Sequence, residues 1–104
     1  MTRRDATERG HHMALPKERM ATHPGEVLLE EYIKPLGLTQ AALAAELEIS
    51  ANRLNELVRG KRGVTADTAL RLARRFDTSP EFWMTLQSLY ELTEARMAMA
   101  GSSK

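Results

Sequence analysis

The sequence contains no cysteine, which excludes a disulfide framework, a thiolate metal site and a cysteine nucleophile. It also lacks an apolar run long enough to span a membrane, and its first residues lack the hydrophobic stretch of a secretory signal. From these absences we expect no membrane partner. We also expect a cytoplasmic location, because disulfides persist mainly in oxidising compartments and this chain can form none.

Residues that could support catalysis do not form a usable pattern. His11, His12 and His23 lie in or beside a polar N-terminal segment, and no His-His or Glu-His spacing lies on one face of a predicted helix. A glycine-rich phosphate loop is absent, and the Glu30-Glu31 pair falls on the polar side of a predicted helix. We therefore expect no enzymatic activity, no metal site and no cofactor.

The charge of the chain is small in total but unevenly distributed. The 104 residues carry a formal net charge of +1. Residues 24–49 contain one basic and five acidic residues, whereas residues 50–76 contain seven basic and two acidic residues. A polyanion would be attracted to the second stretch. The alternative is that these charges form an ordinary solvated surface.

Helix start and stop signals predict five short helices and no strand. Ser and Thr residues precede apolar-periodic segments, and proline occupies the favoured first helical position at Pro24 and Pro80. The expected helical regions are residues 24–36, 39–47, 50–59, 65–76 and a last helix that starts at residue 79. We expect a disordered N-terminal arm over residues 1–22, one domain over residues 23–97 and a flexible tail over residues 98–104.

The second and third predicted helices carry the apolar pattern of a helix-turn-helix. Ala44 takes the position where the two helix axes approach most closely, and a small residue is needed there. The turn position often holds glycine because its φ is usually positive, and Glu48 there should cost about 1 kcal/mol. A helical hairpin in some other small bundle is the alternative. The matching positions are Leu43, Ala44, Leu47, Ile49, Leu54 and Leu57.

This motif assigns DNA-binding roles to the residues around the third helix. Its N-terminal half would face base edges in the major groove, where Arg can contact guanine, Asn can contact adenine and Ala can make only apolar contact. Gln40 and the basic residues after the third helix would contact phosphates. The expected contacts to double-stranded DNA are Gln40, Ser50, Ala51, Asn52, Arg53, Asn55, Arg59, Lys61 and Arg62.

The last predicted helix carries large apolar residues on more than one face. Phe82, Leu86 and Leu89 lie on one face, and Trp83 and Tyr90 lie on another. One face would complete the core, and the other would pair with a second copy, giving a homodimer that reads two DNA half-sites. The alternative is that all five side chains belong to the core.

Several segments resemble the HigA-type antitoxins, also called VapI-like, of the Xre and Cro/repressor helix-turn-helix group. They are residues 23–26 (HPGE), 36–40 (LGLTQ), 57–62 (LVRGKR), 65–73 (TADTALRLA) and 79–83 (SPEFW). The resemblance covers residues 22–92, and its main departure is Glu48 in place of glycine. It implies an all-α fold, a five-helix lambda-repressor-like helix-turn-helix domain.

The resemblance also implies a function. Members of this group repress their own two-gene operon by binding operator DNA, and they neutralise a HigB-like toxin that resembles the RelE-type ribosome-dependent mRNA endonucleases. Two alternatives stay open. One is a stand-alone Xre-family repressor without a toxin partner, and the other is a protein-interaction scaffold.

Overall fold

Five helical regions joined by short connections make up residues 21–102, the part of the chain that the computed structural model describes. The expected all-α class is confirmed, and no strand occurs within these residues. The arm expected over residues 1–22 lies almost wholly outside the described residues. The elements are α2 (Pro24–Leu28), η1 (Leu29–Ile33), α3 (Gln40–Leu47), α4 (Ala51–Val58), α5 (Ala66–Phe76) and α6 (Pro80–Ser102).

The helix starts follow from their capping residues. At each of four starts a serine or threonine hydroxyl accepts a hydrogen bond from the backbone N–H three residues later, which satisfies a donor that has no partner within the helix. The four pairs are Thr39 with Ala42 at 3.0 Å, Ser50 with Arg53 at 3.0 Å, Thr65 with Thr68 at 3.3 Å and Ser79 with Phe82 at 3.1 Å.

The first helical region differs from the single helix that was expected. The short α-helix α2 continues directly into the π-helical segment η1, where the Lys34 N–H donates to the Leu29 carbonyl at 3.0 Å, five residues back. At its start, Gly25 touches the end of α4. A Cβ on Gly25 would lie 1.8 Å from the Leu57 carbonyl oxygen, so only glycine allows α2 to approach α4 this closely.

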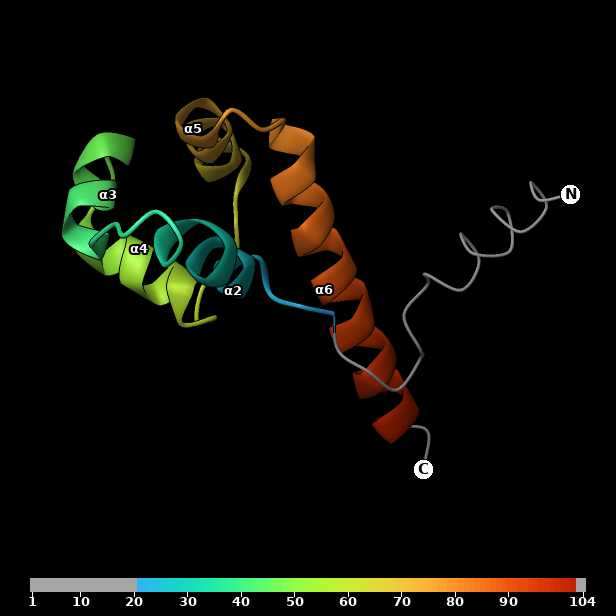
Figure 1. Cartoon of the computed structure of the whole chain (residues 1–104). Helices are drawn as coiled ribbons and strands as arrows, with labels where there is room; N and C mark the ends of the chain where they lie inside the picture. The colour runs from blue at the N-terminus through green and yellow to red at the C-terminus, as the bar shows by residue number, and fades with distance from the viewer. Residues whose placement is uncertain (1–20, 103–104) are drawn as a thin grey trace, which may run out of the picture.

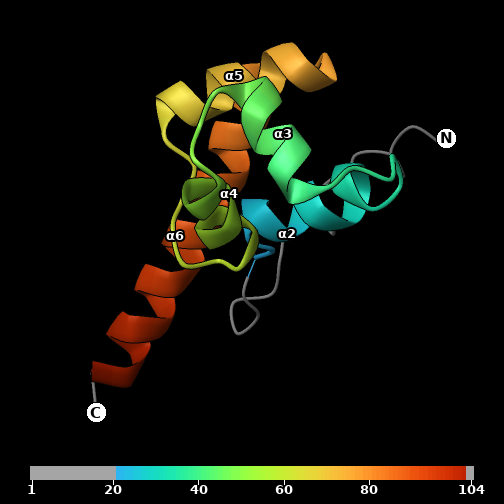
Figure 2. The ribbon, with the colours of Figure 1, turned by 90° about the vertical axis from the view of Figure 1, so that its left-hand side faces the viewer.

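The helices surround one apolar core. α2 packs against α4 and α6, α3 packs against α4 and α5, and α5 packs against α6 (Figure 1). Figure 2 shows the side of the molecule on which α3 and α4 lie nearest the viewer. The buried cluster draws on every helical region and consists of Leu28, Ile33, Leu43, Ala44, Leu47, Leu54, Leu57, Val64, Ala69, Leu72 and Trp83.

The C-terminal end of the chain departs from the expected flexible tail over residues 98–104. α6 continues through Ser102, and its C-terminal half extends away from the other helices (Figure 1). The physical reason is the composition of this segment, because Ala98, Met99 and Ala100 all favour the helix.

Candidate nucleic-acid interface

The turn between α3 and α4 has the left-handed geometry that the sequence pattern predicts. Glu48 has φ 60° and ψ 42°. Its N–H donates to the Ala45 carbonyl at 3.1 Å, and the Ile49 N–H donates to the Ala44 carbonyl at 3.0 Å. This pair of bonds is a Schellman motif, which closes α3 and sets the angle at which α4 leaves. The backbone of Glu48 costs about 1 kcal/mol relative to a relaxed conformation.

The apolar positions of the motif lie where the helix-turn-helix pattern places them. Leu43, Leu47, Leu54 and Leu57 are buried, and Ile49 is half-buried in the turn. The Ala44 side chain is also buried and retains 3% of its surface. The predicted helix-turn-helix core is therefore confirmed. A side chain larger than that of Ala44 would not fit where α3 and α4 pack together.

The outward side of α4 combines exposed and half-buried residues. Ser50, Ala51 and Asn52 are exposed at its N-terminal end, whereas Asn55 is half-buried. The Asn55 side-chain amide donates to the Gln40 side-chain carbonyl at 3.3 Å. This bond joins the start of α3 to the middle of α4, so two of the residues predicted to contact DNA form one hydrogen-bonded pair.

Arg53 has partners within the protein that the sequence pattern did not indicate. Its guanidinium donates to the Asp67 carboxylate at 2.9 Å and to the Thr68 hydroxyl at the start of α5. Asp67 also accepts from Arg71 Nε at 2.9 Å, and its hydrogen bonds to Arg71 and then Arg53 lower its pKa from the ordinary value. A contact from Arg53 to guanine would have to compete with these hydrogen bonds, which join α4 to α5. The base-reading role of Arg53 stays a prediction.

The loop after α4 carries three of the expected phosphate contacts. Arg62 is engaged in the protein, because its Nε and Nη2 donate to one Glu56 oxygen at 3.0 and 2.7 Å. The hydrogen bond from Arg62 lowers the pKa of the Glu56 carboxyl. Arg59 and Lys61 are exposed, and neither forms an ion pair with another of residues 21–102.

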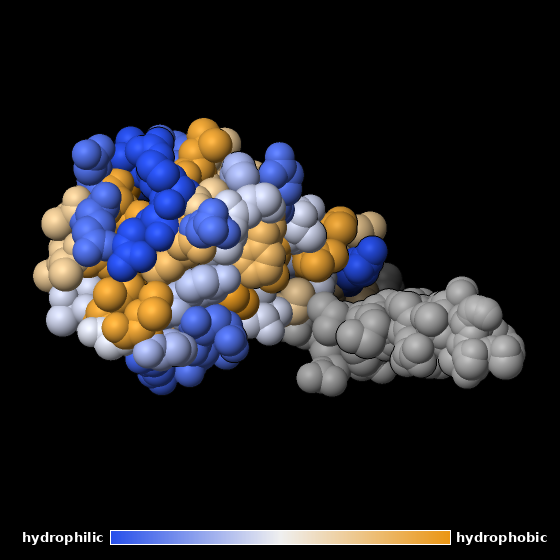
Figure 3. Space-filling view, turned by 45° about the horizontal axis from the view of Figure 1, so that its top comes forward, coloured by the Kyte–Doolittle hydropathy of each residue, from blue (hydrophilic) through white to orange (hydrophobic). Residues whose placement is uncertain are grey.

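Two of the seven basic residues in residues 50–76 pair with the acidic stretch before them. Arg75 forms an ion pair with Glu46, and Arg71 Nη1 lies 3.7 Å from a Glu48 oxygen. Figure 3 shows hydrophilic side chains, in blue, gathered at the upper left of the view, with hydrophobic side chains, in orange, beside them. Arg59 and Lys61 are exposed and take no part in these ion pairs, so they are the better candidates for phosphate contacts. The total count of basic residues overstates the charge that is free to meet DNA.

The expected dimerisation residues on α6 do not all reach the surface. Trp83 was a candidate for either the core or the dimer surface, and it is fully buried, with its indole N–H donating to the Thr78 hydroxyl at 2.8 Å. A second copy cannot contact this side chain, because it fills the space between α6 and the other helices. The remaining residues are at least partly accessible: Phe82 and Leu89 are exposed, and Leu86 and Tyr90 are half-buried.

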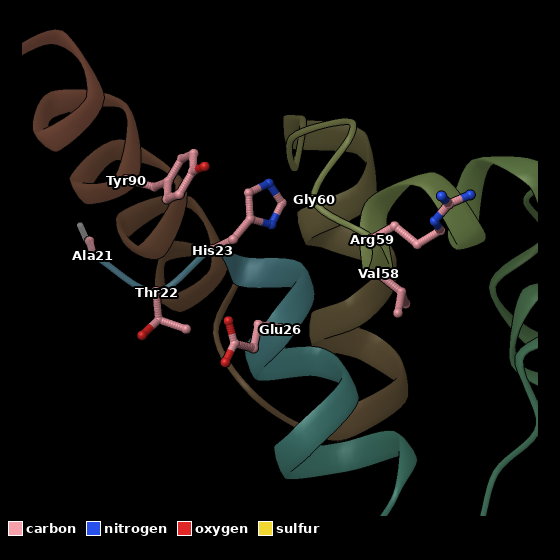
Figure 4. Close-up of a pocket in the computed structure, with 8 residues that line it drawn as sticks. All are labelled: Ala21, Thr22, His23, Glu26, Val58, Arg59, Gly60 and Tyr90. Atoms are coloured by element: carbon pink, nitrogen blue, oxygen red, sulfur yellow. The ribbon is translucent and has the colours of Figure 1, made fainter. Parts of the chain in front are cut away.

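A shallow cleft lies where the start of α2, the end of α4 and α6 meet (Figure 4). The His23 ring stacks edge-on against Tyr90 with 4.8 Å between centroids, and its Nδ1 accepts from the Gly25 N–H at 2.9 Å. Burial lowers the pKa of His23, and the nearby Glu94 and Glu26 partly oppose that shift. Sequence analysis missed this cap because histidine is not a usual helix-capping residue.

Within residues 21–102, no group of three or more His, Asp or Glu side chains is arranged to hold a metal ion. Within the same range, no helix has the length and apolar character required to cross a membrane.

Comparison with known proteins relates this chain to one family and to several similar proteins. The helix-turn-helix family HTH_3 matches residues 29–83. Virulence-associated protein I of Dichelobacter nodosus is 50% identical over 86 residues, which is 80% of this chain and 80% of that protein. The HTH-type transcriptional regulator YbaQ of Escherichia coli is 40% identical over 81 residues, or 78% of this chain and 72% of that protein.

A solved structure gives a similar result. The antitoxin HigA of Pseudomonas aeruginosa, determined with the higBA promoter, matches with a TM-score of 0.76 and 45% identity, and the match covers 81% of this chain and 91% of that chain. The family match over residues 29–83 contains all of α3, the turn and α4. The matched range therefore includes the part of the molecule that carries the candidate interface.

Proposed function

Because this chain belongs to the helix-turn-helix family, and within it to the HigA-type, VapI-like group, we propose that it binds the operator of its own promoter and neutralises a partner toxin. The group consists of regulators and antitoxins, and the chain is not an enzyme. The observation that carries the proposal is the α3–turn–α4 unit, with its left-handed Glu48 and an exposed N-terminal end of α4.

The DNA would meet the outward side of α4. The N-terminal half of a recognition helix faces base edges in the major groove, which gives Asn52 and Ala51 access to them. Ser50 and Gln40, together with the backbone N–H groups near the starts of α4 and α3, would contact phosphates. Arg59 and Lys61 would extend the phosphate contacts beyond the end of α4.

A homodimer would present two such helices to two half-sites. Phe82 and Leu89 are large apolar side chains exposed on α6, and Leu86 and Tyr90 lie beside them with part of their surface accessible. Covering these side chains with a second copy would remove apolar surface from water. The dimer would add a second set of phosphate and base contacts, which a small domain needs for specific binding.

The toxin is proposed to be a HigB-like mRNA endonuclease encoded beside this chain. A tagged copy is co-expressed with the adjacent small open reading frame and purified, and the purified chain is tested for binding to its own upstream DNA. We expect a stoichiometric small partner that is toxic when expressed alone, and preferential binding to the upstream duplex. If no partner is recovered and the upstream DNA is still bound, the antitoxin part of the proposal is wrong.

In that case the second candidate is a stand-alone repressor of the Xre family. It is favoured by the 40% identity to YbaQ, a protein that is named as a transcriptional regulator and not as an antitoxin. A third outcome, in which a partner is recovered but no DNA is bound, would indicate a protein-interaction scaffold. Both DNA-binding candidates place the chain in the cytoplasm.

A further inference from the structure

Gln87 is a buried polar side chain on α6 that connects this helix to the loop after α4. Only 8% of its surface is exposed. Its side-chain carbonyl accepts a hydrogen bond from the Val64 N–H at 2.8 Å, and this bond is buried. Val64 itself is buried in the core, at the point where the loop enters α5. Gln87 therefore holds one end of the loop that carries Lys61 and Arg62.

The orientation of the Gln87 amide is set by a second hydrogen bond. Its Nε2 donates to a Glu91 oxygen at 2.9 Å, one turn further along α6. A carboxylate can only accept, so it selects the orientation in which the amide nitrogen faces Glu91 and the carbonyl faces the loop. The Val64 N–H would have no acceptor if the amide were reversed, and an unsatisfied buried N–H is costly.

Gly63 allows the loop to lie directly against this amide. A Cβ at Gly63 would lie 2.7 Å from Gln87 Nε2 and 2.8 Å from its carbonyl oxygen. Real Cβ atoms do not come this close to other atoms, so any larger residue at position 63 would push the amide away from the Val64 N–H. A close contact and a buried hydrogen bond, both to the Gln87 amide, thus fix this segment of the loop.

We propose that Gln87 is a positioning residue for DNA binding, which holds the loop of residues 60–64 so that Lys61 reaches the phosphate backbone. This inference rests on the proposed function, because it assumes that the loop lies against DNA. It gives the inner side of α6 a part in DNA binding. This part is separate from base contacts made by α4 and from dimerisation through the apolar surface of α6.

The test measures how DNA affinity depends on salt. Wild type and Gln87→Met, which keeps the length of the side chain but cannot accept from Val64, are titrated with the upstream duplex and with an unrelated duplex at several NaCl concentrations. For Gln87→Met we expect about tenfold weaker binding to both duplexes and a salt slope shallower by about 1, since one lost phosphate contact changes the slope by about 0.9. The ratio of the two affinities should stay the same.

Two further variants separate positioning from simple destabilisation. Gly63→Ala displaces the same amide by a different route and should reproduce the shallower slope. Thr93→Val removes the hydrogen bond of another buried polar residue of α6, from the Thr93 hydroxyl to the Leu89 carbonyl at 2.9 Å, without touching the loop, and it should keep the wild-type slope. In a Lys61→Ala, Arg62→Ala background, Gln87→Met should cause no further change in slope.

The outcomes distinguish this inference from the proposed function. A wild-type slope in Gln87→Met, even with a lower melting temperature, would overturn the positioning role and leave operator binding intact. If the wild type shows no preference for the upstream duplex, the proposed operator is wrong, but the slope on the unrelated duplex still decides the role of Gln87. If the wild type binds neither duplex, both ideas fail.

Discussion

The outward sides of α4 and α6 differ in chemistry and in how firmly their side chains are held. On α4, the polar Arg53 and Asn55 are hydrogen-bonded to Asp67 and Gln40. On α6, Phe82 and Leu89 are apolar and retain 38% and 45% of their surface. A polar surface with ordered donors suits a hydrogen-bonding partner such as DNA, whereas an exposed apolar surface suits another protein. The two helices are therefore expected to serve different partners.

The largest effect should come from the inner side of α6. Trp83→Ala removes a fully buried indole, and we expect a loss of about 3–5 kcal/mol in unfolding free energy because of the cavity that remains. Leu89→Ala on the outer side should cost much less in the monomer. Denaturant melts of both variants at low protein concentration check this contrast. Similar losses for the two variants would mean that α6 does not have distinct inner and outer sides.

The contact between α3 and α4 should be the next most sensitive. Ala44→Leu inserts a larger side chain where the two helices meet, and overpacking should cost about 1–3 kcal/mol of stability and weaken DNA binding. Ala45→Leu, at an exposed position of the same helix, is the matched control. Normal stability and binding in Ala44→Leu would contradict the close packing of the helix-turn-helix.

Substitution of Arg53 tests whether a side chain of α4 that is hydrogen-bonded within the protein also contacts DNA bases. Arg53→Ala should weaken specific binding by about 1–3 kcal/mol and relax the preference at one base pair. Asp67→Ala frees the guanidinium from one partner without removing it, so this variant should keep the base preference. Binding is measured on a set of operators with single base changes. If Arg53→Ala binds all of them as the wild type does, Arg53 serves only to join α4 to α5.

The smallest expected effect is a pH dependence at the edge of α6, where His23 meets Tyr90. Burial lowers the pKa of folded His23 below its ordinary value of 6.5, so at mildly acidic pH the unfolded chain binds a proton more readily than the folded chain does. The stability is therefore complete above the unfolded pKa and decreases as the pH falls towards the folded pKa. Protonation of Nδ1 would also remove the acceptor for the Gly25 N–H.

Thermal melts between about pH 7.5 and about pH 5, the range in which histidine titrates, check this prediction. His23→Asn is the control, because asparagine caps helices well and does not titrate. The variant should lose most of the pH dependence in this range. The same dependence in wild type and variant would assign it to groups other than His23.

The features that could be predicted from sequence are those set by neighbouring residues. Thr39, Ser50, Thr65 and Ser79 each cap a helix that starts at the next residue, and the left-handed turn at Glu48 follows from its position in the apolar pattern. Such signals act over three or four residues, so the chain order alone reveals them.

The features that could not be predicted depend on residues far apart in the chain. Arg53 and Asp67 are 14 residues apart, and Gln87 and Val64 are 23 residues apart. Their pairing follows from how the helices pack, which no local pattern records. The burial of Trp83 is a similar case, because an aromatic residue on a two-sided apolar helix can face either way until its neighbours are known.

The hydrogen bonds from Arg53 to Asp67 and from Asn55 to Gln40 also affect the entropy change when the protein binds DNA. Arginine and glutamine lose rotamer freedom when they are ordered at an interface, at a cost of about 0.5–1.5 kcal/mol for each side chain. Here that freedom is already reduced while the protein is free in solution. A DNA complex that uses these side chains near their present orientations would lose less conformational entropy on forming. A larger share of the free energy of each contact would then appear as binding affinity.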